Sequence, residues 1–223
     1  MDAVIKIGGS VLQKGTIKEL CKTLDSLAVE YSLVIVPGGG DYANQVRNYY
    51  QTFQLSETTA HWMAIFTENI LGFLLLEYMD VGVPAFSISE IVEASENSKI
   101  PVFMPFQHLF KQDPLPHSWD VTSDSIAAYI AESLGAQKLI LLKDVDGIYT
   151  RDPKKFHGKD VRLIPEIDLK KDKLADFHSC IDKYLPSLLE KYNRSCYIVN
   201  GLHPERLVKV MKNQKTINTL IKI

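Results

Sequence analysis

Two short apolar runs in the first forty residues each end in a cluster of glycines. The first, Val4 to Ser10, carries Lys6 inside a β-rich run and breaks into two glycines and a serine. The second, Leu33 to Val36, continues into Pro37 and three glycines. Between them, apolar residues from Ile17 to Tyr31 recur at helical spacing. This order of strand, helix and strand predicts a parallel sheet with right-handed crossovers.

Lys6 is the unusual residue of the first run. A charged side chain inside a core strand must reach an edge where water or an anion can solvate it. The glycines that follow let backbone N–H groups approach a ligand closely, and a helix that starts there adds to the anion site. We therefore expect phosphate at this strand end.

The rest of the chain continues the alternation of strands and helices. The loop Asp113 to Pro116 suggests a boundary between an N-terminal lobe, 1–115, and a C-terminal lobe, 116–223. The pattern predicts helices over Glu57–Met79 (capped by Ser56), Ser125–Leu134, Leu174–Tyr192 (kinked or divided by Pro186) and Pro204–Lys212, and strands over Val83–Ile88, Val102–Met104, Lys138–Leu142, Cys196–Val199 and Thr219–Ile223.

Ligands of an open parallel sheet bind beyond the carboxyl ends of its strands. The strand ends near Gly8, Gly38, Asp144 and Gly201 are all polar or glycine-rich, so we expect them to share one rim of the sheet. An ordinary βα turn explains any one of them alone. Two glycine-rich turns together with a strand lysine favour a phosphate site.

Composition excludes several classes of function. The formal net charge of the 223 residues is -2, and basic residues are scattered, so the pattern gives no electrostatic footprint for nucleic acid. Three cysteines far apart fit neither a disulfide framework nor a zinc ribbon. The most apolar stretch, Ile70 to Leu76, is cut off by Glu77 and is well short of a span of ~20 residues. We expect a cytoplasmic protein with no membrane or nucleic-acid partner.

The sequence lacks both standard nucleotide fingerprints, G-x-x-x-x-G-K-S/T and G-x-G-x-x-G. A phosphoryl-transfer site needs cations on the moving group, backbone amides around it and a fixed acid that orients the cations. The chain has residues of these kinds in Lys6, Gly8, Gly9, Gly39, Gly40 and Asp124.

Four motifs in a fixed order make a specific resemblance. They are Lys6 to Ser10, Pro37 to Gly40, Thr122-Ser123-Asp124 opening an alanine-rich helix, and the run Lys143 to Pro153. Together they resemble the amino-acid kinase family, and the match extends from Val4 to Ile221. The resemblance implies an α/β fold, a three-layer αβα sandwich of the carbamate kinase-like type with a mainly parallel open sheet. It also implies an acceptor-binding, dimer-forming N-terminal lobe and a C-terminal lobe that binds ATP with Mg²⁺.

The resemblance also implies residue roles. Lys6 would stabilise the transferring phosphoryl group, and Asp124 would organise the catalytic lysines. Lys183 would be the second catalytic lysine, although the two glycines that precede this lysine in several family members are missing here. The alternative interpretation is an ordinary solvent-exposed lysine on a helix. Residues expected to bind ATP are Gly8, Gly9, Ser10, Lys143, Asp144, Asp146, Gly147, Tyr149, Asp152 and Lys154. No protein metal site is expected.

The acceptor is less constrained than the reaction. Lys14 follows the first glycine turn as a lysine does in isopentenyl phosphate kinases, but Asp41 to Asn44 replaces their Ser-Phe-Gly-His. UMP kinases carry an arginine-rich acceptor region, and only Arg47 lies near the second glycine turn here. The segments His61 to Ile65 and Ile198 to Arg206 resemble a small archaeal branch that phosphorylates aminomethyl-furanmethyl phosphate to the diphosphate in methanofuran synthesis.

An acceptor that is already a phosphate monoester needs an extra cation. The candidates are Lys14, Arg47 and His61, and Trp62 or Phe66 would pack a small ring. The expected acceptor site is Gly38, Gly39, Gly40, Lys14, Arg47, His61 and Thr122. A non-catalytic nucleotide-binding subunit on the same fold is the alternative, suggested only by the missing glycines before Lys183.

Overall fold

The computed structural model describes residues 1–12, 15–156, 158, 160–174 and 177–223. Its strands are β1 (Ala3–Ile7), β2 (Leu33–Pro37), β3 (Gly82–Ala85), β4 (Ile100–Phe103), β5 (Lys138–Lys143), β6 (Ile148–Tyr149), β7 (Leu163–Ile164), β8 (Glu166–Asp168), β9 (Cys196–Asn200) and β10 (Thr219–Lys222). Its helices are α1 (Gly9–Leu12), α2 (Ile17–Leu27), α3 (Gly40–Thr52), α4 (Glu57–Leu76), α5 (Ile88–Glu96), α6 (Pro105–Gln112), α7 (Ser123–Ser133), α8 (Leu185–Tyr192) and α9 (Pro204–Met211).

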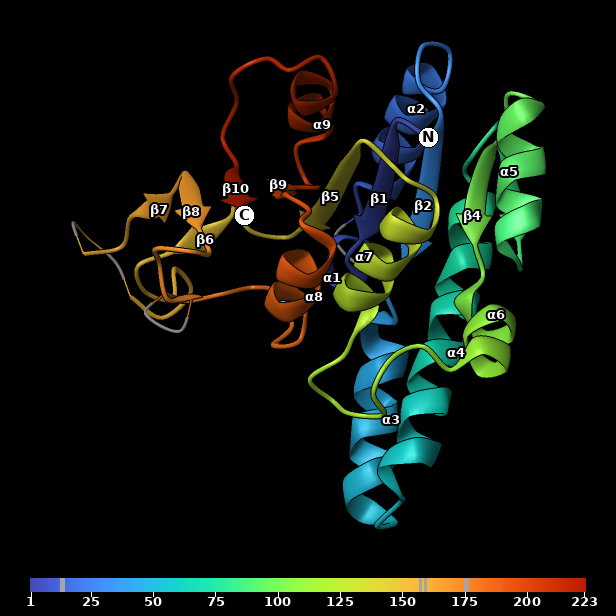
Figure 1. The fold of residues 1–223 in the computed structure, drawn as a ribbon, viewed down its shortest axis with the longest axis horizontal. Coiled ribbons are helices and arrows are strands. Elements are labelled where there is room, and N and C mark those ends of the chain that lie inside the picture. The colour runs from blue at the N-terminus through green and yellow to red at the C-terminus, as the bar shows by residue number, and fades with distance from the viewer. Residues whose placement is uncertain (13–14, 157, 159, 175–176) are drawn as a thin grey trace.

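The described residues form an eight-stranded sheet in the order β3-β4-β2-β1-β5-β9-β10-β8, with β6 and β7 as a separate pair. All neighbouring strands of the large sheet are parallel except β9 and β10. Helices α5, α7 and α8 cover one face, and α2 and α9 cover the other (Figure 1). The fold is therefore the three-layer αβα sandwich that the sequence predicts.

Alternation along the central strands divides the core in two. Ile5 and Ile7 of β1 pack with α2 and α9, whereas Val4 packs with α7 and α8. Lys6 has the same parity as Val4, and Lys143 has the same parity as Leu141, which also packs on the α7 side. Both lysines therefore leave the sheet on the face that α7 covers.

The strand ends do share one rim. The Gly38 N–H donates to the Ile7 carbonyl (2.8 Å), the Gly8 N–H donates to the Leu142 carbonyl (2.9 Å), and the Gly201 N–H donates to the Lys143 carbonyl (2.8 Å). The hydrogen-bond ladder thus continues from β2 through β1 and β5 to β9, past the last residue of the strands. The expected rim is confirmed.

One sequence-predicted helix is half wrong. The pattern predicts helix from Leu174 to Tyr192, but α8 begins only at Leu185, with Pro186 in its first turn. The residues before it are used elsewhere, because His178 forms a bridge with Tyr149 and Asp182 accepts hydrogen bonds from the start of α7. These contacts across the chain outweigh a local helical pattern.

Helix α4 is long and begins at the predicted cap, where the Ser56 hydroxyl accepts from the Thr59 N–H. Among the described residues, it is the one helix long and apolar enough to cross a membrane by length and composition alone. A core helix passes the same test, and α4 packs against α3, α6 and the sheet. Its buried residues include Ile65, Leu71 and Leu75.

Candidate active site

Two lysines and one aspartate meet at the rim of the sheet. Lys6 Nζ lies 2.8 Å from Asp124 Oδ1, and Lys143 Nζ lies 2.6 Å from Asp124 Oδ2. Lys6 is next to the last residue of β1, Lys143 ends β5, and Asp124 stands in the first turn of α7. All three side chains are almost fully buried. Two ammonium groups and one carboxylate give the group one net positive charge beside the glycine turns.

The pKa values of this group follow from burial and mutual charge. Burial works to raise the pKa of Asp124, but the two lysines outweigh it and hold that pKa well below its usual range. Burial also lowers the pKa of Lys6, against the attraction of Asp124. Asp124 is therefore an anion at neutral pH, and it keeps two cations side by side in a buried place.

Asp182 holds this group in position, a role that no motif in the sequence indicates. Its carboxylate accepts from the backbone N–H groups of Thr122 (2.9 Å) and Ser125 (3.0 Å) and from both of their hydroxyls. Its own N–H donates to Asp124 Oδ2 (3.2 Å). The first turn of α7, which carries Asp124, is therefore fixed from a segment almost 60 residues further along the chain.

The two glycine turns approach each other more closely than any side chain permits. A Cβ atom on Gly9 would collide with the Cα atom of Gly40, which itself has φ +54°. Gly8 and Gly38 already donate their amides to the sheet ladder. The amides of Gly9, Ser10, Gly39 and Gly40 remain as candidate donors to phosphate.

Replacing Gly9 by alanine is expected to push the two turns apart, because its Cβ atom would collide with backbone atoms of Gly40 and not with the end of a flexible side chain. We expect a loss of about 1–3 kcal/mol in the free energy of unfolding and a lower kcat/KM. Gly135→Ala is the control: it meets no atom within 4 Å but has φ +56°, so it strains the backbone away from the site. Thermal melts and steady-state kinetics separate the two effects; a Gly9→Ala protein with unchanged kcat/KM contradicts this role.

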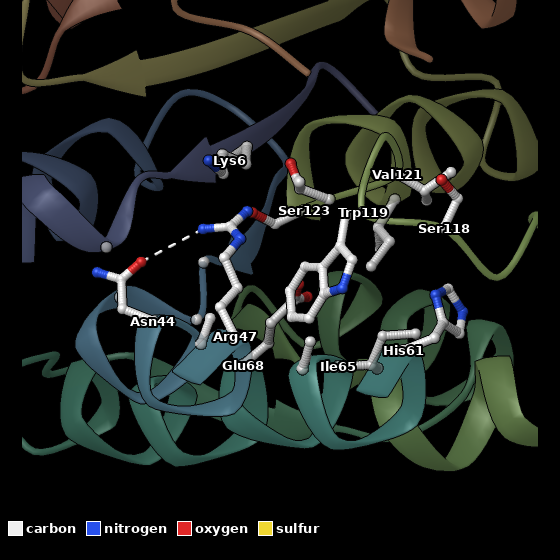
Figure 2. Close-up of a pocket in the computed structure, with 18 of the residues that line it drawn as sticks. Lys6, Asn44, Arg47, His61, Ile65, Glu68, Ser118, Trp119, Val121 and Ser123 are labelled. Carbon is white, nitrogen blue, oxygen red and sulfur yellow. Dashed lines mark hydrogen bonds between the residues drawn. The ribbon is translucent and has the colours of Figure 1, made fainter. Parts of the chain in front are cut away.

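A cavity of about 200 Å³ opens beside Lys6 (Figure 2). Its walls come from β1, the start of α3, α4, and the segment before α7. The predicted acceptor residues Gly38, Gly39, Gly40, Arg47, His61 and Thr122 all line it. Lys14 lies outside the described residues. Glu68 and Trp119 also line the cavity, and neither is predicted from the sequence.

Trp119 in the wall of this cavity holds the positively charged side chain of Arg47. The guanidinium of Arg47 lies 4.8 Å from the centre of the Trp119 ring, a cation–π contact that directs it over the indole. His61 stacks on His117 with ring centres 4.5 Å apart. Burial and the neighbouring His117 lower the pKa of His61 to about 4. At neutral pH, His61 can therefore offer a hydrogen bond but not the extra cation expected of it from the sequence.

A second cavity, of about 260 Å³, lies toward the β5 end of the rim. Of the residues expected to bind ATP, Asp144, Gly147, Tyr149, Asp152 and Lys154 line it, together with His178 and Cys180. Gly147 is required there, since it has φ +151° and a Cβ atom at this position would collide with the Thr219 hydroxyl. Asp146 instead binds Asn200 and Arg206.

The sequence matches a family model described as the amino acid kinase family over residues 1–200. The chain belongs to this family. A (5-(aminomethyl)furan-3-yl)methyl phosphate kinase of Methanocaldococcus jannaschii is 33% identical over 222 residues, which are 98% of this chain and 96% of that protein. A uridylate kinase of Archaeoglobus fulgidus is 26% identical and is covered completely, with 99% of this chain aligned.

Solved structures agree on the fold. The crystal structure of uridylate kinase from Archaeoglobus fulgidus matches with a TM-score of 0.76 at 23% identity, over 99% of this chain and 100% of that one. UMP kinase from Ureaplasma parvum matches with a TM-score of 0.75 at 18% identity, over 100% of this chain and 99% of that one. As a member of a family of kinases, this chain is an ATP-dependent phosphotransferase.

Lys183 does not join the central group of this kinase. Its Nζ lies 3.1 Å from Asp120 Oδ1, and 84% of its side chain is exposed. The segment that carries it is not helical, because α8 begins two residues later. Lys143, which is expected from the sequence among the ATP-binding residues, occupies the position beside Asp124 instead.

Proposed function

We propose that this kinase transfers the γ-phosphoryl group of ATP to a small phosphate monoester that carries an aromatic ring and an aminomethyl group. The product is the corresponding diphosphate. The observation that carries this proposal is the 33% identity, over almost the whole chain, to a (5-(aminomethyl)furan-3-yl)methyl phosphate kinase. The cavity beside Lys6 supports it, because its volume of about 200 Å³ suits a small acceptor.

In this reaction, an oxygen of the acceptor phosphate attacks the γ-phosphorus while the bond to the β–γ bridging oxygen breaks, and ADP leaves. We propose that Lys6 and Lys143 stabilise the negative charge that develops on the transferring phosphoryl group. Their ammonium groups share the Asp124 carboxylate at the rim beside the acceptor cavity. Asp124 holds both lysines. The amides of Gly9, Ser10, Gly39 and Gly40 complete the phosphate site.

ATP would place its adenosine in the cavity of Asp144, Tyr149 and Lys154, away from the acceptor cavity. Magnesium neutralises phosphate charge in such reactions. Within the described part of the chain, no three His, Cys, Asp or Glu side chains gather into a metal site, so the donor set does not fit a protein-held ion. We propose that Mg²⁺ arrives bound to ATP.

Arg47 is the cation that we propose for the acceptor phosphate. It lines the cavity and is directed by Trp119, whereas His61 is neutral at physiological pH. The division into an acceptor lobe, 1–115, and an ATP lobe, 116–223, also remains a proposal, as do cytoplasmic location and a homo-oligomeric state. The segment before α7 contributes Ser118 and Trp119 to the acceptor cavity, so the second part of the chain would reach across to the acceptor.

UMP is the second candidate acceptor. Uridylate kinases of several archaea are 24–29% identical to this chain over nearly its whole length. Both acceptors are phosphate monoesters, so the central lysines would serve either reaction.

A panel of acceptors tests the proposal. We expect ADP formation from ATP with aminomethyl-furanmethyl phosphate at a kcat/KM at least about 100-fold above that for UMP or isopentenyl phosphate, because discrimination by a hydrogen-bonding site reaches this size. Coupled-enzyme assays of ADP release measure it, with product mass as a check. A higher kcat/KM for UMP would show that UMP, and not aminomethyl-furanmethyl phosphate, is the acceptor. Binding of ATP without turnover on any acceptor would instead indicate a regulatory subunit.

A further inference from the structure

Glu68 is a buried acid in the acceptor cavity that the reaction described above does not use. It lies on α4, two turns after His61, and only 4% of the residue is exposed. Figure 2 shows its side chain pointing from α4 into the cavity. Its Oε2 atom is buried and has no hydrogen-bond partner within the described part of the chain.

A carboxylate oxygen without a partner is unfavourable in a buried place. The neighbouring cation, Lys6, is held by Asp124 at 2.8 Å. Burial raises the pKa of Glu68 well above its usual range, and the negative charges of Asp124 and Asp182 add to this effect while Lys6 opposes it. A cation that entered the cavity would supply the missing partner and favour the charged form of Glu68.

The other walls of the cavity define what kind of ligand completes it. Lys6 and Arg47 are cations that suit a phosphate, and Trp119 offers the face of an aromatic ring. Glu68 adds a buried carboxyl group that a cation can pair with. A ligand that satisfies all of these groups has an anionic end, a flat middle and a cationic hydrogen-bond donor.

We propose that Glu68 binds a primary ammonium group of the acceptor and thereby selects phosphate monoesters that carry an amine. This inference rests on the proposed function, because it concerns the same acceptor. Glu68 is a specificity residue: it binds the ammonium group of the acceptor and takes no part in the phosphoryl transfer. Acceptors without an amine leave the carboxyl group of Glu68 buried without a hydrogen-bond partner, which penalises their binding.

The test compares two acceptors in the intact protein. One is aminomethyl-furanmethyl phosphate, and the other is the same molecule with a methyl group in place of the aminomethyl group. We expect wild type to favour the amine by at least about tenfold in kcat/KM. Glu68→Gln is expected to abolish this preference, with the KM for ATP unchanged. Calorimetric titration of both acceptors provides a second readout that does not depend on turnover.

Two matched variants locate the effect. Glu77→Gln changes an acid just beyond the end of α4 and is expected to keep the preference of wild type. Glu57→Gln changes an exposed acid in the first turn of α4 that also lines the cavity. If Glu57→Gln removes the preference and Glu68→Gln keeps it, the ammonium group lies at the mouth of the cavity and the inference about Glu68 is wrong.

Stability distinguishes a binding role from a structural one. Because Glu68 carries an unpaired buried oxygen, Glu68→Gln is expected to melt at or above the temperature of wild type. A large fall in Tm would show that Glu68 supports the fold and would overturn the inference. Failure of wild type to phosphorylate or bind either acceptor counts against the proposed function itself. Turnover of both acceptors with the same preference in Glu68→Gln counts against Glu68 alone.

Discussion

Replacing Lys143 by methionine lowers kcat about 100- to 1,000-fold, the loss typical for removal of one preorganised donor to a developing charge. Lys143 ends β5 and lies against Asp124, where its ammonium group stands beside that of Lys6. Methionine keeps much of the length and the apolar stem of the side chain, and Asp124 keeps one lysine partner. The fold is therefore expected to survive, and steady-state kinetics report the loss directly.

Lys183→Met is the matched control for this result. Its ammonium group is exposed and paired with Asp120, so its removal is expected to leave kcat within about twofold of wild type. Lys6→Met should behave like Lys143→Met. If instead Lys183→Met abolishes turnover and Lys143→Met does not, the late lysine closes onto the substrates during the reaction and the assignment of Lys143 is refuted.

Replacing Asp124 by asparagine is expected to lower the free energy of unfolding by roughly 3–5 kcal/mol, because it leaves two buried lysines without a counter-ion. For a chain of this length, this loss corresponds to a fall in Tm of roughly 6–20 °C. Turnover is expected to fall as well, since neither lysine keeps its place. Thermal and denaturant unfolding measure the first effect, and initial rates measure the second.

The pH dependence of stability gives Asp124 a separate signature. Its pKa in the folded protein is held below the unfolded value, so its contribution to stability is complete above the unfolded pKa of about 3.9 and is lost as the pH falls toward the folded pKa. Asp124→Asn should lack this part of the acid transition. Asp120→Asn, at an exposed ion pair, should change stability by no more than about 0.5 kcal/mol. Equal effects of both variants would contradict the central role of Asp124.

Much of the fold follows from local patterns in the sequence. Apolar runs predict β1, β2 and β5, and helical spacing together with Ser56 predicts α4. The helix expected from Leu174 is wrong before Leu185, because its residues are committed to contacts with α7 and Tyr149 that no local pattern reveals. Helices α3, α5 and α6 are not predicted from the sequence, because each of them buries only one or two of its residues and so carries little of the apolar pattern that predicts a helix.

The candidate site is predicted in part. The resemblance to the amino-acid kinase family implies that Asp124 organises the catalytic lysines, and the structure places the Asp124 carboxylate in contact with Lys6. The side of the sheet on which Lys143 lies follows from the alternation of side chains along a strand. Leu139, Leu141 and Lys143 point to the same face of the sheet as Val4 and Lys6. The position of Glu68 follows from helical spacing, because Glu68 lies on the same face of α4 as His61 and Ile65. The role of Asp182 cannot be predicted from the sequence, because its hydrogen-bond partners are far away in the chain.

The two central lysines project from neighbouring strands, β1 and β5, and this limits how far apart their side chains start. Lys6 pairs in register with Leu141, so Lys143 is its diagonal neighbour on the adjacent strand. The distance between neighbouring strands, about 4.8 Å, is a property of the peptide backbone and does not depend on side chains. The backbone therefore fixes where the two side chains start, and Asp124, which pairs with both ammonium groups, fixes where they end. Substitutions in α3 and α4 can therefore alter the acceptor cavity while β1, β5 and Asp124 keep the two ammonium groups together.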